Sequence, residues 1–214
     1  NMNIDKEINN LVNYTMKMGE LVLDNLQLAM STYYHYDEET ANKINDDVVD
    51  ANERLIEEMC LNLMLKERPF AKDLRVVSGI LKLVEDLERL GDHAEDIKAF
   101  AKKLKDYEYV SIKKLDEAYK ESTKMVLDSI SSLVNRDEAQ AYEVIKSDDK
   151  VDVLYEEALE EIIEGSKENK YPIECSIYTT LITKYIERIA DHAVNVAEWV
   201  IYILRGFHKD KQIF

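Results

Sequence analysis

Two acidic side chains four residues apart occur twice in the chain, each time inside the same seven-residue pattern. Glu88 and Asp92 lie in Glu-Arg-Leu-Gly-Asp-His-Ala, and Glu187 and Asp191 lie in Glu-Arg-Ile-Ala-Asp-His-Ala. Residues four apart project from one face of a helix, about one turn from each other. Carboxylates held this close repel each other, and partial burial raises the cost, so they need a proton, a basic partner or a cation. We predict that both pairs bind metal.

Further oxygen ligands continue the pattern on the same helices and on the helices that precede them. Asp96 and Asn195 extend the two stripes by one more turn. An earlier segment in each half carries another acidic pair at the same spacing, on a helix that should pack antiparallel to the motif helix. Facing carboxylates on neighbouring helices are how bundles assemble metal sites. One cluster per half is therefore predicted, with these ligands: Asp46, Asp50, Glu88, Asp92 and Asp96 in the first half, and Asp148, Asp152, Glu187, Asp191 and Asn195 in the second.

Each of these elements also has a simpler interpretation. An isolated Asp-x-x-x-Asp in an acidic helical protein usually marks a solvated face, so the aspartates of the earlier helices gain weight only because they recur in order with the motif. His93 and His192 are rotated by about 100° from the aspartates before them, which favours hydrogen bonding between helices over direct metal ligation. Arg89 and Arg188 suit ion pairs with neighbouring acids, and contact with a metal-bound anion is the alternative.

The elements that must position these side chains are helices. Apolar residues recur at helical spacing almost throughout, without sustained strand-like alternation. Asp37 and Asp137 suit N-caps, and Pro69 and Pro172 suit first helical turns. Breaks divide the chain into six predicted helices and lie near residues 34–37, 67–69, 107–111, 135–137 and 169–172. Because the acidic segment and the motif recur in the same order, we predict an all-α fold of two tandem, duplicated, antiparallel three-helix bundles of spectrin-repeat type, residues 1–107 and 108–214.

The composition excludes several classes of partner. The 28 Lys and Arg against 44 Asp and Glu give a net charge of −16, which disfavours nucleic acid and anionic lipid headgroups. Cys60 and Cys175 belong to no metal or redox motif, the N-terminus lacks an apolar signal core, and the longest apolar run, 199–204, is too short to cross a bilayer. We expect a soluble cytoplasmic protein without membrane insertion.

A homodimer is expected, as is common for soluble oligomers. The thirteen tyrosines are expected to serve packing rather than stacking of a ligand.

The segments LERLGDHAEDIK and IERIADHAVNVAEWVIYI, each preceded by a DDxVD helix, resemble the duplicated signature of the PhoU family of phosphate-signalling regulators. The resemblance spans nearly the whole chain and implies two three-helix bundles whose E/DxxxD motifs bind iron or zinc, as one or more divalent or trivalent ions per cluster. It further implies a cytoplasmic regulator that acts with the ATPase subunit of the phosphate ABC transporter and with a phosphate-sensing histidine kinase. Such a regulator holds phosphate uptake and the phosphate-starvation response down when phosphate is plentiful. Asp96, in place of a frequent Asn, and Ala190, in place of Gly, depart from the family pattern.

Two other kinds of function fit the same carboxylates less well. A ferritin-like metalloenzyme or metal-storage protein is the alternative, but its di-iron site needs Glu-x-x-His on two helices, and no histidine here has a Glu three residues before it. A purely structural bundle would pair every motif acid with Lys or Arg, which the excess of acids disfavours. The chain has no nucleophile–base arrangement, phosphate loop or nucleotide motif. We therefore predict no catalytic residues and no site for an organic cofactor.

Overall fold

The structure, a computed structural model, describes residues 2–213, which form six long helices in the predicted order. These are α1 (Met2–Tyr34), α3 (Asp46–Asn62), α4 (Ala71–Leu104), α5 (Lys113–Val134), α6 (Glu138–Lys167) and α7 (Ile173–Arg205). Two short elements complete the first half: α2 (Glu38–Asn42) and the π-helical turn η1 (Leu63–Glu67). After α7, β1 (Phe207–His208) and β2 (Lys211–Gln212) pair as a small antiparallel hairpin that the sequence analysis missed. The all-α fold class is confirmed.

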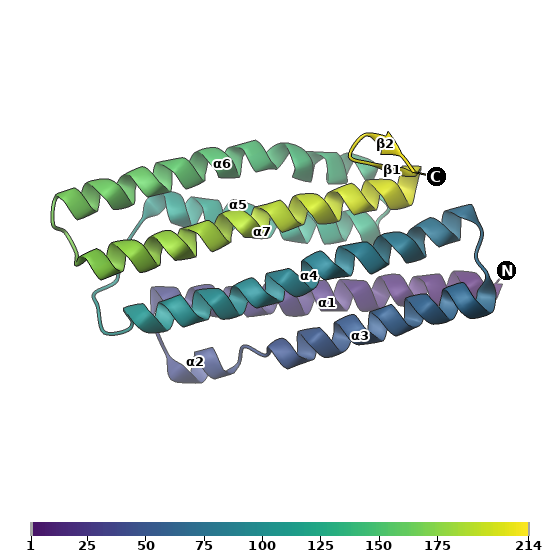
Figure 1. The fold of residues 1–214 in the computed structure, drawn as a ribbon, viewed down its shortest axis with the longest axis horizontal. Coiled ribbons are helices and arrows are strands. Elements are labelled where there is room, and N and C mark those ends of the chain that lie inside the picture. The colour runs from purple at the N-terminus through teal and green to yellow at the C-terminus, as the bar shows by residue number, and fades with distance from the viewer. Residues whose placement is uncertain (1, 214) are drawn as a thin grey trace.

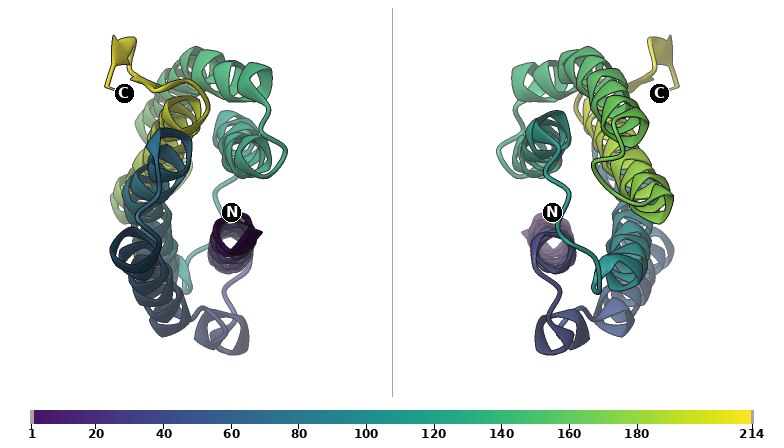
Figure 2. Two further views of the ribbon diagram at one scale, coloured as in Figure 1. Left: turned by 90° about the vertical axis from the view of Figure 1, so that its right-hand side faces the viewer. Right: turned by 90° about the vertical axis from the view of Figure 1, so that its left-hand side faces the viewer.

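The long helices lie in two layers (Figure 1, Figure 2). One layer has the order α3, α4, α7, α6, because α4 packs against both α3 and α7, and α6 packs against α7. The other layer contains α1, which packs against α4, and α5, which packs against α7. One hydrophobic core therefore runs through both bundles. The predicted boundary after residue 107 falls in the connection between α4 and α5, and it stays a prediction.

The apolar stripes of α4 and α7 face this core and determine how each helix is rotated about its axis. Burial of a Leu, Ile or Val side chain contributes about 1.5–3 kcal/mol, so together these side chains outweigh the cost of crowding a few acids. With the stripes turned inward, the acidic stripe of α4 is directed toward α3, and that of α7 toward α6. The buried side chains are Leu83, Leu87, Leu90, Ala94 and Ile97 of α4, and Ile182, Ile186, Ile189, Ala193 and Val196 of α7.

One helix break differs from the prediction and alters the first cluster. The predicted second helix is interrupted after α2, and α3 begins at Asp46, with Asn45 as its N-cap. The Asn45 side chain accepts a hydrogen bond from the Val48 amide at 3.3 Å. The sequence offers no Gly or Pro here, so this single cap residue was the only signal. As a result, Asp46 lies in the first turn of α3, where the helix dipole favours a carboxylate, whereas Asp148 lies inside the continuous α6.

The other helix boundaries agree closely with the sequence. Asp37 caps α2 and Asp137 caps α6, as predicted. Pro69 precedes the N-cap of α4 and Pro172 is itself the N-cap of α7, so both prolines lie just before the first turn rather than inside it. None of the described helices has an apolar stretch long enough to cross a bilayer.

Candidate metal centre

In the first half, the predicted acids of α3 and α4 face each other between the two helices. Partial burial raises the pKa of Asp46 to about 6, with further contributions from Asp50 and Asp92. Partial burial raises the pKa of Glu88 to about 7, and the neighbouring acids Asp92, Glu53 and Asp50 add to this effect. The pKa of Asp92 is raised by burial as well. The structure thus brings these predicted residues of α3 and α4 into one cluster of mutually repelling carboxylates.

The second half repeats this cluster between α6 and α7. Burial raises the pKa of Asp148 to about 6, and Asp152, Asp191 and Glu187 raise it further. The pKa values of Asp152 and Asp191 are also raised, first by desolvation and then by Glu187. All four predicted carboxylates of this half therefore interact across the helix pair.

One carboxylate oxygen in each cluster is left without a partner. Asp46 Oδ1 and Asp148 Oδ1 are both buried, and neither makes a hydrogen bond within the described part of the chain. Gly91 permits the close helix approach in the first half, since a Cβ there would lie 3.2 Å from Val49 Cγ1 and 3.4 Å from Asp46 Oδ1. A buried carboxylate oxygen without a partner costs free energy. A cation bound beside Asp46 Oδ1 or Asp148 Oδ1, which are equivalent atoms of the two halves, would therefore stabilise the fold. The carboxylate oxygens of each cluster are suitable ligands for such a cation.

The carboxylates are spread apart rather than gathered around a point. Among residues 2–213, no three His, Cys, Asp or Glu side chains are already close enough to hold one ion. Ionised carboxylates repel one another when no cation lies between them. Ligation at either cluster therefore requires these side chains to change rotamer.

The two clusters differ in charge, a difference that the sequence analysis missed. Lys184 Nζ lies 2.6 Å from Glu187 Oε2 and partly neutralises the second cluster. The equivalent residue of α4 is Glu85, and both residues stand three positions before the motif glutamate. Glu85 and Asp50 raise the pKa of Glu53, after the larger effects of its burial and of Glu57. The first cluster thus has more uncompensated negative charge than the second.

The motif histidines join α4 to α7 instead of facing the clusters. His192 Nε2 lies 3.0 Å from His93 Nε2, and His192 Nδ1 lies 2.9 Å from Asp86 Oδ1. The predicted role of these histidines as hydrogen-bond partners between helices is confirmed. Asp86 escaped notice because Tyr185 occupies the equivalent position of α7, so it has no repeated signal.

The third member of each predicted stripe turns toward the same α4–α7 contact. Asn195 donates its side-chain amide to Asp86 Oδ1 at 3.1 Å, and its role as a ligand stays a prediction. Asp96 lies at the edge of the first cluster, where burial and then Asp92 raise its pKa, and Asp96 Oδ2 is 3.6 Å from His93 Nδ1.

The predicted ion pairs of the motif arginines are absent from the described side chains. The Arg188 guanidinium lies over the Tyr185 ring, 5.5 Å from its centroid. Arg89 makes no ion pair with an acid of the described chain and acts on the pKa of Asp92 from a longer distance. Both arginines are therefore free of a tight carboxylate partner.

Comparison with known proteins places this geometry in a family. The PhoU domain model matches twice, over residues 15–100 and 115–200, and each match contains one cluster. The phosphate-specific transport system accessory protein PhoU homologue of Clostridium acetobutylicum is 32% identical over 210 residues, 96% of either chain. That of Aquifex aeolicus is 36% identical over 211 residues, 96% of this chain and 94% of its own.

Solved structures resemble the chain over nearly its full length. The phosphate transport system regulatory protein PhoU from Streptococcus pneumoniae has a TM-score of 0.88 at 27% identity, covering 97% of this chain and 100% of its own. PhoU from Pseudomonas aeruginosa has a TM-score of 0.85 at 30% identity, covering 95% and 99%.

The raised pKa values predict that the carboxylates destabilise the metal-free protein increasingly as pH rises. The pKa values of Asp46 and Asp148, about 6 each, exceed the ordinary 3.8, so the folded state binds more protons than the unfolded state between these limits. The free energy of unfolding therefore falls as pH rises through this window. In EDTA, Asp46→Asn with Asp148→Asn should raise the unfolding temperature relative to wild type, by an amount that grows from pH 5 to pH 7.5. Asp47→Asn is the matched control, and a gain independent of pH would contradict the prediction.

Proposed function

The chain belongs to the PhoU family, and from this membership we propose that it is a cytoplasmic, metal-binding regulator of phosphate uptake and phosphate homeostasis. Similar proteins are named as accessory or regulatory proteins of phosphate transport. We propose that this chain, as a homodimer, restrains the phosphate-starvation response through the ATPase subunit of the phosphate ABC transporter and a phosphate-sensing histidine kinase. The observation that carries the metal-binding part is the pair of carboxylate clusters, repeated in both halves.

The donor set of each cluster favours a metal ion that prefers oxygen ligands. The two motif histidines are hydrogen-bonded to each other between α4 and α7, and only His93 Nδ1 approaches a cluster, 3.6 Å from Asp96 Oδ2 at its edge. Zinc sites commonly include His or Cys, whereas carboxylate oxygens suit harder cations, so of the two metals associated with the family we propose iron. The proposed ligands are Asp46, Asp50, Glu88 and Asp92, with Asp96 at the edge, and Asp148, Asp152, Glu187 and Asp191.

The clusters have two physical properties that suit a phosphate regulator. Each joins two helices, so cation binding would hold α3 to α4 and α6 to α7. The protein has a net charge of −16 and repels phosphate in general. A cation held by these carboxylates would supply the local positive charge that an anion needs. Binding of the metal ion would thus both fix the helix pairs of each bundle and create a site for an anion.

The position of the histidines also separates the proposed regulator from its alternative, a ferritin-like metalloenzyme or metal-storage protein. Sites of that type take an imidazole from Glu-x-x-His on each of two helices. Here His192 is held by Asp86 and His93 at the contact between α4 and α7, and His93 approaches only Asp96, at the edge of the first cluster. We therefore propose an adaptor without catalytic activity.

Replacement of the motif aspartates tests metal binding. Asp92→Ala with Asp191→Ala should lower metal affinity about 10-fold or more, while circular dichroism stays unchanged because neither side chain packs in the core. Since Lys184 partly neutralises the second cluster, Lys184→Glu should tighten binding there, and Asp149→Ala is the matched control. The measurement is elemental analysis of protein purified without chelators, followed by iron and zinc titration. Wild-type protein that neither retains nor takes up metal would contradict the proposal.

The regulatory role requires a test in cells. Deletion of the gene should derepress a phosphate-starvation reporter in phosphate-rich medium, because the restraint is lost. Wild-type protein should restore repression, and the Asp92→Ala, Asp191→Ala variant should restore it less well. Reporter expression that is unchanged by deletion would exclude the regulatory role, whatever the metal content of the protein.

A further inference from the structure

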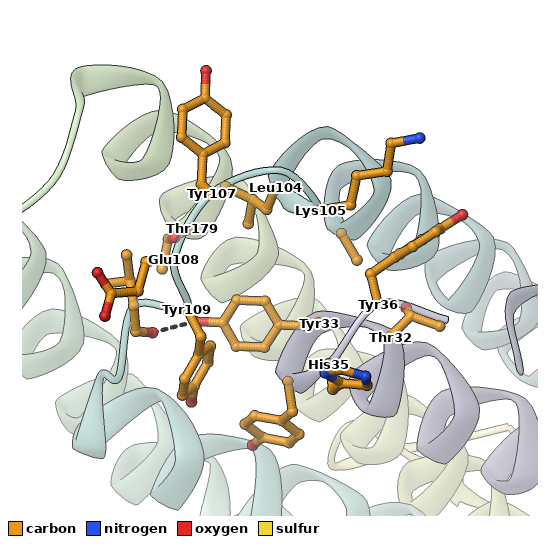
Figure 3. A pocket seen from close by; sticks show the side chains of 13 residues that line it. Thr32, Tyr33, His35, Tyr36, Leu104, Lys105, Tyr107, Glu108, Tyr109 and Thr179 are labelled. Atoms are coloured by element: carbon orange, nitrogen blue, oxygen red, sulfur yellow. Dashed lines mark hydrogen bonds between the residues drawn. The ribbon is translucent and has the colours of Figure 1, made fainter. Parts of the chain in front are cut away.

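A cavity of about 180 Å³ lies at the junction of the two halves, beyond the carboxylate clusters (Figure 3). Its walls come from the ends of α1 and α4, from the connection that follows α4, and from α7. The tyrosines were expected only to pack, but several gather around this one cavity. They are Tyr33, Tyr34, Tyr36, Tyr107 and Tyr109.

Three hydroxyl groups at this cavity already donate their protons within the protein. Tyr33 donates to the Val110 carbonyl at 3.1 Å, and Tyr34 donates to Asp116 Oδ1 at 2.8 Å. Thr32 donates to a carbonyl of its own helix at 2.6 Å. These three oxygens therefore offer a ligand only their lone pairs. A ligand that binds these three oxygens must bring hydrogen-bond donors.

Thr179 provides an independent sign of a missing partner. Its side chain is fully buried and lines the cavity beside the Tyr33 hydroxyl. The Thr179 hydroxyl makes no hydrogen bond within residues 2–213, whereas the Thr183 hydroxyl, one turn further along α7, donates to the Thr179 carbonyl. A buried hydroxyl without a partner costs free energy, which a hydrogen-bonding ligand would recover.

Fixed charges and aromatic rings around the cavity favour a cation. α1 and α4 both end here, and the C-terminal end of a helix is partially negative. α1 has no basic residue in its last turn, whereas α4 has Lys102 and Lys103 in its last turn. Glu108 adds a carboxylate at the rim. The rings of Tyr33, Tyr34 and Tyr109 pack with centroids 5.4–5.8 Å apart, and the faces of tyrosine rings attract cations.

Two basic side chains also lie at the rim. Lys105 extends outward from the cavity in Figure 3. The His35 side chain is exposed to solvent at the rim rather than buried in the cavity. Neither side chain supplies a buried positive charge. The acceptor oxygens and the helix ends therefore determine which ligands the interior of the cavity favours.

We propose that this cavity binds a guanidinium group, either the arginine side chain of a partner protein or a free arginine-like metabolite. A guanidinium group has five N–H donors and no acceptor, so it matches the acceptor oxygens of Thr32, Tyr33 and Tyr34. It is planar and stacks on aromatic rings, which suits the tyrosine faces. Binding would tie the connection between the halves to α1 and α7. The inference goes beyond the proposed function and does not depend on metal.

The test is titration of wild-type protein with N-acetylarginine methylamide, followed by calorimetry and NMR chemical shifts. The citrulline analogue has nearly the same shape without the charge and should bind at least about 10-fold more weakly. Thr179→Val removes the free hydroxyl at constant shape and should weaken arginine binding about 10-fold, whereas Thr183→Val, the matched control, should not. Glu108→Gln changes only an exposed rim residue and should also weaken binding, so the test remains valid if Thr179→Val misfolds.

Two further ligands distinguish the sources of the guanidinium group. Tighter binding of a short arginine-containing peptide than of free arginine assigns the site to a partner protein, and the reverse assigns it to a metabolite. Either order supports the proposal. Absence of saturable binding at millimolar arginine amide would overturn it. Equal binding of the citrulline analogue, or unchanged affinity in both Thr179→Val and Glu108→Gln, would overturn it as well.

Discussion

Repulsion among carboxylates that the packing forces together is the constraint on which the rest of this structure depends. Burial of the apolar stripes on α4 and α7 determines their rotation, and that rotation directs Glu88 and Asp92 at α3, and Glu187 and Asp191 at α6. The burial energy of many apolar side chains exceeds the cost of crowding a few acids. The crowding of these carboxylates is therefore a consequence of how the core packs.

Duplication explains the two clusters, but the halves are no longer equivalent. The pair formed by His93 and His192 lies between α4 and α7, and Asp86 holds only one of the two imidazoles. Lys184 neutralises part of the second cluster, where the first has Glu85. The clusters should thus differ in cation affinity, and the histidine contact connects the helices that carry them.

The sequence predicted features that depend on spacing within one helix and on repetition. The acidic pairs, the buried stripes and the order of the helices follow from helical periodicity, which neighbouring helices do not alter. The sequence did not predict the features that depend on contacts between distant segments of the chain. Asn195 continues its stripe in sequence, yet its amide is hydrogen-bonded to Asp86 of another helix, a contact that spacing within one helix does not predict. The break before Asp46 has only Asn45 as a signal, and the tyrosine cavity combines four separate segments.

The most direct test of this account is an anomalous scattering map, collected at the iron edge from crystals grown without chelators. Peaks are expected between α3 and α4 beside Asp46 and Asp92, and between α6 and α7 beside Asp148 and Asp191. The first peak should have the higher occupancy, because its cluster has more uncompensated negative charge. Iron-soaked crystals without a peak at either helix pair, or with peaks only elsewhere, would contradict the claim that packing creates cation sites from these carboxylates.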